Sequence, residues 1–187
     1  MTALHAAGAP ALTLRAMTAT DATIVARLHA ASWRTAYRGI LSEEYLAGDV
    51  DLEREYVWTK RLERLVALQF GVIAAFGAIP VGFVFVEGHV DPVYGNLIDN
   101  LHVSPEARSA GIGPQLLAAA ANGMAERGWD RRVHLWVWNA NTRARAFYAR
   151  LGGREVETGM KSVADGTEAQ TWRVVWDDFD ALRPTSH

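Results

Sequence analysis

The feature that most constrains the fold of this chain is a strand, a glycine-rich turn and a helix in direct succession within residues 96–128. Residues 97–103 are rich in Leu, Ile and Val and are followed by Ser-Pro, which indicates a buried strand. A turn containing Gly111 and Gly113 comes next. Pro114 suits the first turn of a helix, because its missing N–H would be unpaired there in any case. Apolar residues then recur at helical spacing, so the segment predicts a strand–turn–helix unit.

The start of that helix is suited to binding an anion. Its first N–H groups have no partner inside the helix, and the helix dipole favours negative charge at this end. Gly111 and Gly113 allow a phosphate to approach the backbone, and Arg108 adds a positive charge. A dinucleotide-binding turn would need a third glycine, and a P-loop would need a lysine followed by a hydroxyl residue. The turn has neither, which makes both alternatives weak.

Composition and charge exclude several other classes of protein. With 187 residues and 50% hydrophobic content, we expect one domain over residues 12–177, between a flexible leader (1–11) and a flexible tail (178–187). The 19 basic residues nearly balance the 21 acidic ones, so we expect no nucleic-acid-binding face. No long apolar run or signal peptide stands out, so we expect no membrane segment and a cytoplasmic location. The chain has no Cys and no His-x-x-x-His pattern, so we expect no metal site.

A second strand–helix unit lies further along the chain. Residues 132–138 indicate a strand, and Asn141 or Thr142 can cap the helix after it, which Gly152 would end. This helix reads N-x-x-A-x-x-F-Y-x-x-L-G from Asn141 onward. Its inward-facing positions recur at helical spacing, so the unit has the same form as the first one.

Three segments together resemble the GNAT superfamily of acetyl-CoA-dependent N-acetyltransferases. They are V-x-P followed by R-x-x-G-x-G over residues 103–113, the N-x-x-A-x-x-F-Y-x-x-L-G helix, and W-x-x-A-Y-x-G-I-L over residues 33–41, typical of one subgroup. Gly153 departs from the family pattern, which usually has a large apolar residue there. The resemblance implies a single-domain α/β (α+β) fold with a mixed, mostly antiparallel sheet of about seven strands, flanked by about four helices. We expect residues 41–69 to be helical.

The resemblance also implies acetyl-CoA as co-substrate. Strand backbone N–H groups would bind the acetyl carbonyl and pantetheine, and the glycine turn would cradle the diphosphate. The implied contacts are Leu101, His102, Val103, Arg108, Ser109, Ala110, Gly111, Ile112, Gly113, Pro114, Asn141, Phe147 and Tyr148. Tyr148 is the candidate general acid that would protonate the departing thiolate. The alternative is an ordinary core tyrosine with a solvated hydroxyl.

The general base is harder to place. If residues 97, 99, 101 and 103 share one face of the strand, Asp99 is the ionisable residue beside the reacting groups and could act through water. Burial in an apolar strand would raise its pKa, which is useful for a base. Alternatively, Asp99 pairs with an arginine and holds the sheet together. Glu44 and His102 are rival candidates.

The acceptor is predicted least sharply. Trp33, Tyr37, Trp136 and Trp138 could form an aromatic-walled pocket for a small amine, and a cationic one would gain cation–π contacts. Alternatively, the seven Trp fill the core and a subunit interface, which would suit a homodimer. The predicted function is acetyl transfer to a small primary amine in a ternary complex. A catalytically silent coenzyme A-binding module and a protein or peptide N-acetyltransferase are the alternatives, and loops 33–41 and 160–167 would decide the last.

Overall fold

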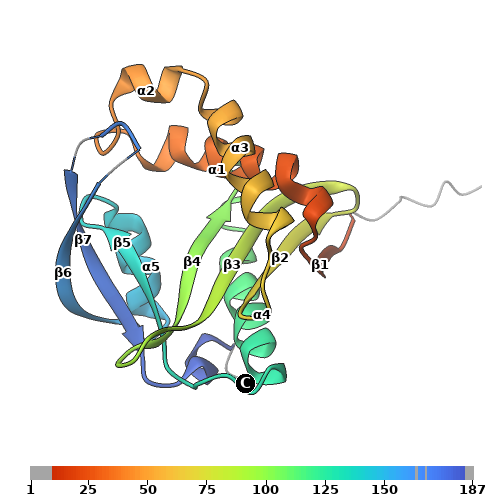
Figure 1. The fold of residues 1–187 in the computed structure, drawn as a ribbon, viewed down its shortest axis with the longest axis vertical. Helices are drawn as coiled ribbons and strands as arrows, with labels where there is room; N and C mark the ends of the chain where they lie inside the picture. Colours follow the sequence, from red (N-terminus) through yellow and green to blue (C-terminus); the bar gives the residue numbers. More distant parts are fainter. Residues whose placement is uncertain (1–9, 163, 167, 184–187) are drawn as a thin grey trace, which may run out of the picture.

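A seven-stranded mixed sheet organises the chain in the order β1-β2-β3-β4-β5-β7-β6 (Figure 1). This computed structural model describes residues 10–162, 164–166 and 168–183. Most of the expected leader and the end of the expected tail lie outside these residues. The elements are β1 (Leu12–Ala16), α1 (Ala22–Ala36), α2 (Glu43–Ala47), α3 (Val50–Glu63), β2 (Gln69–Phe76), β3 (Ile79–Asp91), β4 (Gly95–Val103), α4 (Ile112–Glu126), β5 (Val133–Trp138), α5 (Thr142–Arg150), β6 (Arg154–Ser162) and β7 (Glu168–Trp176). The predicted fold class and strand number are confirmed.

The sheet separates between β4 and β5. These two strands run parallel and pair only at Asn96 with Val133 and at Leu97 with His134. Every other pair of neighbouring strands is antiparallel over five or more positions. Beyond Leu97 the two strands diverge, and residues of both line the cavity described below. The splay therefore provides the opening in which a ligand can lie against the backbone of β4.

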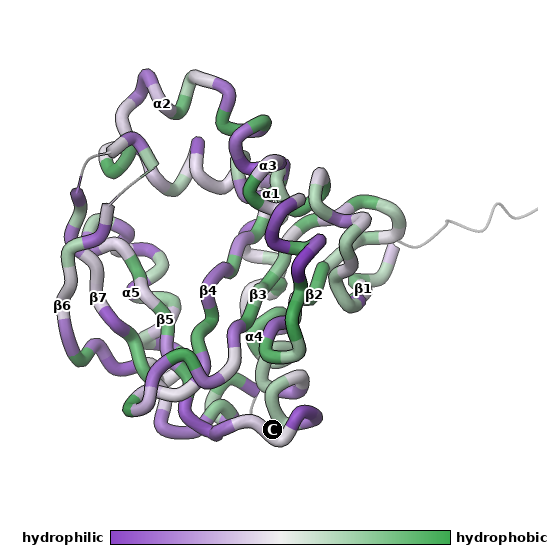
Figure 2. The backbone as a smooth tube through the Cα atoms, viewed as in Figure 1, coloured by the Kyte–Doolittle hydropathy of each residue, from purple (hydrophilic) through white to green (hydrophobic). Residues whose placement is uncertain are grey.

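Helices cover the two faces of the β1–β4 half of the sheet. On one face α4 contributes a fully buried row of apolar residues, which are Leu116, Leu117, Ala120, Ala121 and Met124. On the other face α1 and α3 pack over Phe83 and Phe85 of β3, with Trp58 of α3 buried against both rings. Figure 2 shows hydrophobic positions concentrated along the central strands. Burial on both faces explains why β2 and the first half of β3 are almost continuously apolar rather than alternating.

Two expectations about helical segments need correction. Residues 41–69 are not one helical stretch, because Gly48 ends α2 and a separate α3 begins at Val50. Part of the expected tail is packed rather than free, since Phe179 and Leu182 are 2% and 1% exposed in a short 3-10 helix (Phe179–Leu182) that contacts α4. The described residues contain five α-helices, where about four were expected, and packed residues continue past residue 177. None of these helices is long and apolar enough to cross a membrane.

Candidate active site

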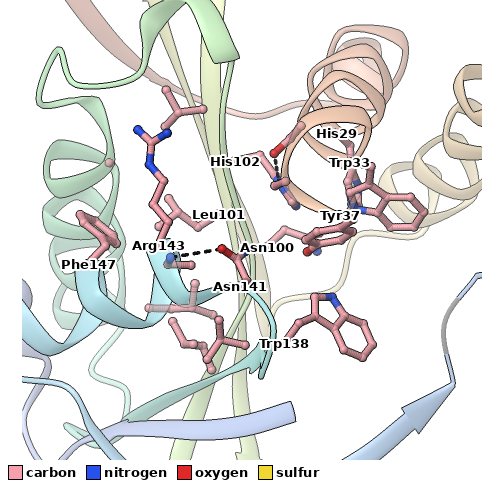
Figure 3. A pocket seen from close by; sticks show the side chains of 18 of the residues that line it. His29, Trp33, Tyr37, Asn100, Leu101, His102, Trp138, Asn141, Arg143 and Phe147 are labelled. Carbon is pink, nitrogen blue, oxygen red and sulfur yellow. Dashed lines mark hydrogen bonds between the residues drawn. The ribbon is translucent and has the colours of Figure 1, made fainter. Parts of the chain in front are cut away.

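One cavity of about 840 Å³ runs along the splay between β4 and β5. Its walls come from both strands, the C-terminal end of α1, the N-terminal end of α4, and α5. The cavity brings together every predicted cofactor contact except Ala110, and it also includes Asp99, Trp33, Tyr37 and Trp136. Figure 3 shows Trp33, Tyr37 and Trp138 at one end of this space and Arg143 and Phe147 at the other.

The start of α4 forms a positively polarised cradle at the second end of the cavity. Gly111 is the N-cap residue in a left-handed conformation, φ 72°, and no side chain caps the helix. The first amides of α4 belong to residues that line the cavity, and they have no side-chain acceptor. A Cβ on Gly113 would lie only 3.1 Å from the Phe147 ring, so the absence of a side chain keeps this approach open. The geometry suits a phosphate, as the sequence predicted.

Two arginines add charge to the same cradle. Arg108 lines the cavity with the start of α4 and donates to the Thr35 hydroxyl of α1 at 2.6 Å, which holds its guanidinium in place. Burial lowers the pKa of Arg108, and the nearby charge of Arg143 lowers it further. Two like charges held close together are unfavourable unless an anion joins them. The residues present thus fit a coenzyme A diphosphate: α4 amides, Arg108 and Arg143 would hold it.

Tyr148 enters the cavity from α5. The helix begins at Asn141, whose side-chain oxygen accepts from the Ala144 N–H at 3.2 Å (Figure 3). Tyr148 is 8% exposed, and its ring packs edge-on against Trp176. Burial raises the pKa of Tyr148, and the neighbouring Tyr37 phenol raises it further. The hydroxyl is therefore protonated at neutral pH, which is the state a proton donor requires.

Aromatic residues form the opposite end of the cavity. The rings of Trp33 and Tyr37 lie 5.6 Å apart, and Tyr37 meets Trp138 edge-on at 6.2 Å. They pack against one another and also line the cavity, so the core and pocket interpretations both describe them. Burial raises the pKa of Tyr37 to about 12, a hydrogen bond with Trp138 opposes this, and the charge of Asp99 adds to it. Tyr37 is thus close to both Tyr148 and Asp99.

A β-bulge changes the expected geometry around Asp99. In the pairing of β3 with β4, Phe85 lies opposite Asn100 while Val86 lies opposite Ile98, which leaves Asp99 as the extra residue. Cross-strand partners project to the same face. Leu97 pairs with Glu87 on the α3 side, whereas Leu101 pairs with Val84 in the α4 core. The expectation that positions 97 to 103 alternate without interruption is therefore wrong.

Asp99 is part of an ion-pair network. Its carboxylate lies 2.6 Å from the Arg61 guanidinium, which also bonds Glu87, and it accepts a hydrogen bond from Asn100. The alternative interpretation, in which Asp99 pairs with an arginine, is confirmed. Asp99 nevertheless lines the cavity, so its role as a base acting through water stays a prediction. Glu44 is exposed on α2 and does not line the cavity.

A buried histidine pair lies beside the cavity and was not expected from the sequence. The His29 and His102 rings lie 4.3 Å apart, His102 Nδ1 is 3.0 Å from the Ser32 hydroxyl, and His29 Nδ1 accepts from the Trp58 indole. Burial lowers the pKa of His102 to about 3 and that of His29 well below its usual 6.5. So weak a base cannot take a proton from an ammonium, which argues against His102 as the general base. The spacing of His29 and Ser32 on one helix face was the available signal.

The histidine pair predicts an acid-labile fold. Because the native pKa of His102 is near 3 and the ordinary value is 6.5, the unfolded state binds the extra proton between these values. Stability is therefore present above the ordinary pKa and is lost as the pH falls below it. We expect His102 to lower the free energy of unfolding by about 2 kcal/mol between about pH 7 and pH 5. Urea unfolding at both pH values measures the loss. If the free energy of unfolding falls as much between these two pH values in His102→Gln as in the unchanged protein, the prediction is wrong.

Among the residues that the structure describes, no three His, Asp or Glu side chains gather where they could hold a metal ion.

Comparisons with known proteins identify the family. Residues 28–153 match the model of the Acetyltransferase (GNAT) family. The chain belongs to this family. It is therefore an acyltransferase, and the resemblance seen in the sequence motifs is confirmed. A comparison with curated proteins gave no significant match.

Solved structures share the fold at low sequence identity. A GCN5-related N-acetyltransferase from Rhodopseudomonas palustris is 22% identical, with a TM-score of 0.69 over 92% of this chain and 98% of its own. The PaiA N-acetyltransferase from Thermoplasma acidophilum, solved with coenzyme A, is 20% identical, with a TM-score of 0.67 over 87% of this chain and 98% of its own. Arabidopsis thaliana NAA60, solved with a bisubstrate analogue, is 15% identical, with a TM-score of 0.63 over 89% and 97%.

Proposed function

We propose that this GNAT acyltransferase moves an acetyl group from acetyl-CoA directly to the primary amine of a small molecule in a ternary complex. The cradle at the start of α4, with Arg108 and Arg143, supports the choice of co-substrate. The Thermoplasma neighbour was solved with coenzyme A, and its fold is the same. The thioester supplies the activated acetyl group, and the chain has no cysteine that could carry an acyl intermediate.

Different residues around the splay would then carry out the two proton transfers of the reaction. Asp99 would take the proton of the incoming ammonium through a water molecule, with Arg61 stabilising its carboxylate. Backbone N–H groups near Leu101 and Val103 would bind the carbonyl oxygen, as expected for an acyl transfer. Tyr148 would donate its proton to the departing thiolate, since its phenol is neutral and faces the cavity. Each role needs only groups that line this one cavity.

The observation that favours a small acceptor is a bridge across the aromatic end. The Ser42 N–H, just after the α1–α2 loop, donates to the Asp165 carboxylate in the β6–β7 turn at 2.8 Å. Trp138 of β5 and Ala169 of β7 pack with Tyr37 beneath this bridge. A second cavity of about 310 Å³ lies between the same segments. The two loops that would have to part for a peptide chain are therefore joined.

A thiol-release assay with acetyl-CoA tests this proposal. We expect release with small primary amines and little or none with peptides of about ten residues carrying a free N-terminus or lysine, because a peptide would have to part the two loops that the Ser42–Asp165 hydrogen bond joins. Asp165→Ala should raise peptide turnover if the bridge is the barrier. Turnover of peptides alone by the unchanged protein would favour the peptide alternative. Binding of coenzyme A without release for any amine would favour the silent module.

A further inference from the structure

The protein's own cations already lie over two of the four aromatic rings that a cationic acceptor would use. The Arg54 guanidinium lies 4.4 Å from the centre of the Trp33 ring. Lys161 Nζ and the Arg173 guanidinium each lie 4.6 Å from the centre of the Trp136 ring. A cationic acceptor would therefore meet like charges where the sequence suggested free ring faces. Like charges in such proximity disfavour binding.

Among the described residues that line this end of the cavity, Lys161 is the cation without an ion pair. Arg54 bonds Glu53, Arg61 bonds Glu87 and Asp99, and Arg173 bonds Asp91 and Glu157. Lys161 lines the cavity from β6 and makes no ion pair with any of the residues described. The burial around it lowers its pKa, and the Asp99 charge partly opposes that effect. The Lys161 ammonium thus lies over the Trp136 ring and interacts electrostatically with Asp99. It forms no salt bridge with any described carboxylate.

On the basis of the proposed function, we infer that the acceptor is an amine carrying a carboxylate, of the amino acid class. Its carboxylate binds Lys161 above Trp136, and its amine faces Asp99 and Tyr148. The Asp99–Arg61 pair and the unpaired Lys161 then match the two charges of a zwitterion. A phosphate would present two charges to a single unpaired cation, whereas the arginines suited to bidentate binding already hold carboxylates. A monoanionic carboxylate is the group that balances this site.

Matched acceptors test the inference. L-phenylalanine, its primary amide and phenethylamine share one side chain, but only the first carries a carboxylate. Leucine with its amide and its decarboxylated amine forms a second series, and cadaverine is a further acceptor. We expect kcat/KM to be about tenfold higher for each amino acid than for its amide or decarboxylated amine. Lys161→Met should raise KM for the amino acids about tenfold and leave the amides and amines unchanged. For each acceptor, the kinetic constants of the variant are divided by those of the unchanged protein. This ratio cancels differences in the intrinsic reactivity of the amines.

Two further variants separate charge from structure. Lys161→Arg retains the charge and should retain the preference for amino acids. Lys60→Met removes the other lysine of the chain, which lies exposed on α3, and should change nothing. Equal or better turnover of amides, amines or cadaverine, together with no effect of Lys161→Met, would overturn the inference and leave the proposed function standing. If no amine at all is acetylated, the proposed function fails, and the inference fails with it.

Discussion

Replacing Tyr148 with phenylalanine is expected to lower kcat about a hundredfold, the size of effect that a lost general acid produces. The phenol lines the cavity between β4 and β5, and burial together with Tyr37 keeps it protonated. Within the described part of the chain its hydroxyl makes no hydrogen bond, so phenylalanine should fit without loss of stability. Affinity for coenzyme A should stay nearly the same, since the ring remains and the phosphate cradle is elsewhere.

A matched control makes this result interpretable. Tyr56 on α3 is 67% exposed, and Tyr56→Phe should leave kcat unchanged. Steady-state rates with a fixed amine, calorimetry with coenzyme A and a thermal melt separate chemistry from binding and folding. A kcat for Tyr148→Phe within about twofold of the unchanged enzyme would remove Tyr148 as the general acid, since proton donation contributes far more than that. A parallel loss of coenzyme A affinity would instead assign Tyr148 a binding role.

Local signals in the sequence predicted the two strand–helix units well. Gly111 adopts the left-handed conformation that its turn needs, and Asn141 caps α5 through its side chain. Both features depend on residues within four positions of each other, so the sequence contains all the information they need. For this reason the cofactor end of the cavity was largely predictable.

Features set by distant residues were not predictable. The bulge at Asp99 depends on how β4 pairs with β3, and the histidine pair depends on α1 packing across the sheet. Gly153 is a similar case, because a Cβ there would lie 2.6 Å from both the Trp176 ring and Val174. Trp176 occupies the space that a large residue at position 153 would take. The departure from the family pattern is thus compensated by a residue on β7.

The aromatic end of the cavity, where the acceptor would bind, was also only partly predictable from the sequence. The sequence correctly placed Trp33, Tyr37 and Trp136 beside the cavity. It could not show that Arg54, Arg173 and Lys161 would lie over the two tryptophan rings. These cations come from α3, β6 and β7, far from the tryptophans in sequence. Aromatic residues alone predict where a pocket lies. The charge that the pocket selects depends on long-range partners.

Removing both Arg108 and Arg143 is expected to weaken coenzyme A binding about a hundredfold, with about tenfold for each single change to alanine. The two guanidiniums lie close enough for the charge of Arg143 to lower the pKa of Arg108, so a bound diphosphate would relieve their repulsion as well as pair with both. Binding should also weaken as salt is raised, and this salt dependence should be smaller in the double variant.

Calorimetry with coenzyme A at low and high salt checks this prediction, and Arg27→Ala serves as the matched control because Arg27 is exposed on α1 and makes no ion pair with any described residue. The test is independent of the acceptor, since no amine is needed. If the double variant binds coenzyme A as tightly as the unchanged protein, the start of α4 is not the phosphate site. The diphosphate would then have to lie elsewhere along the splay, and the placement of the thioester beside Tyr148 would lose its main support.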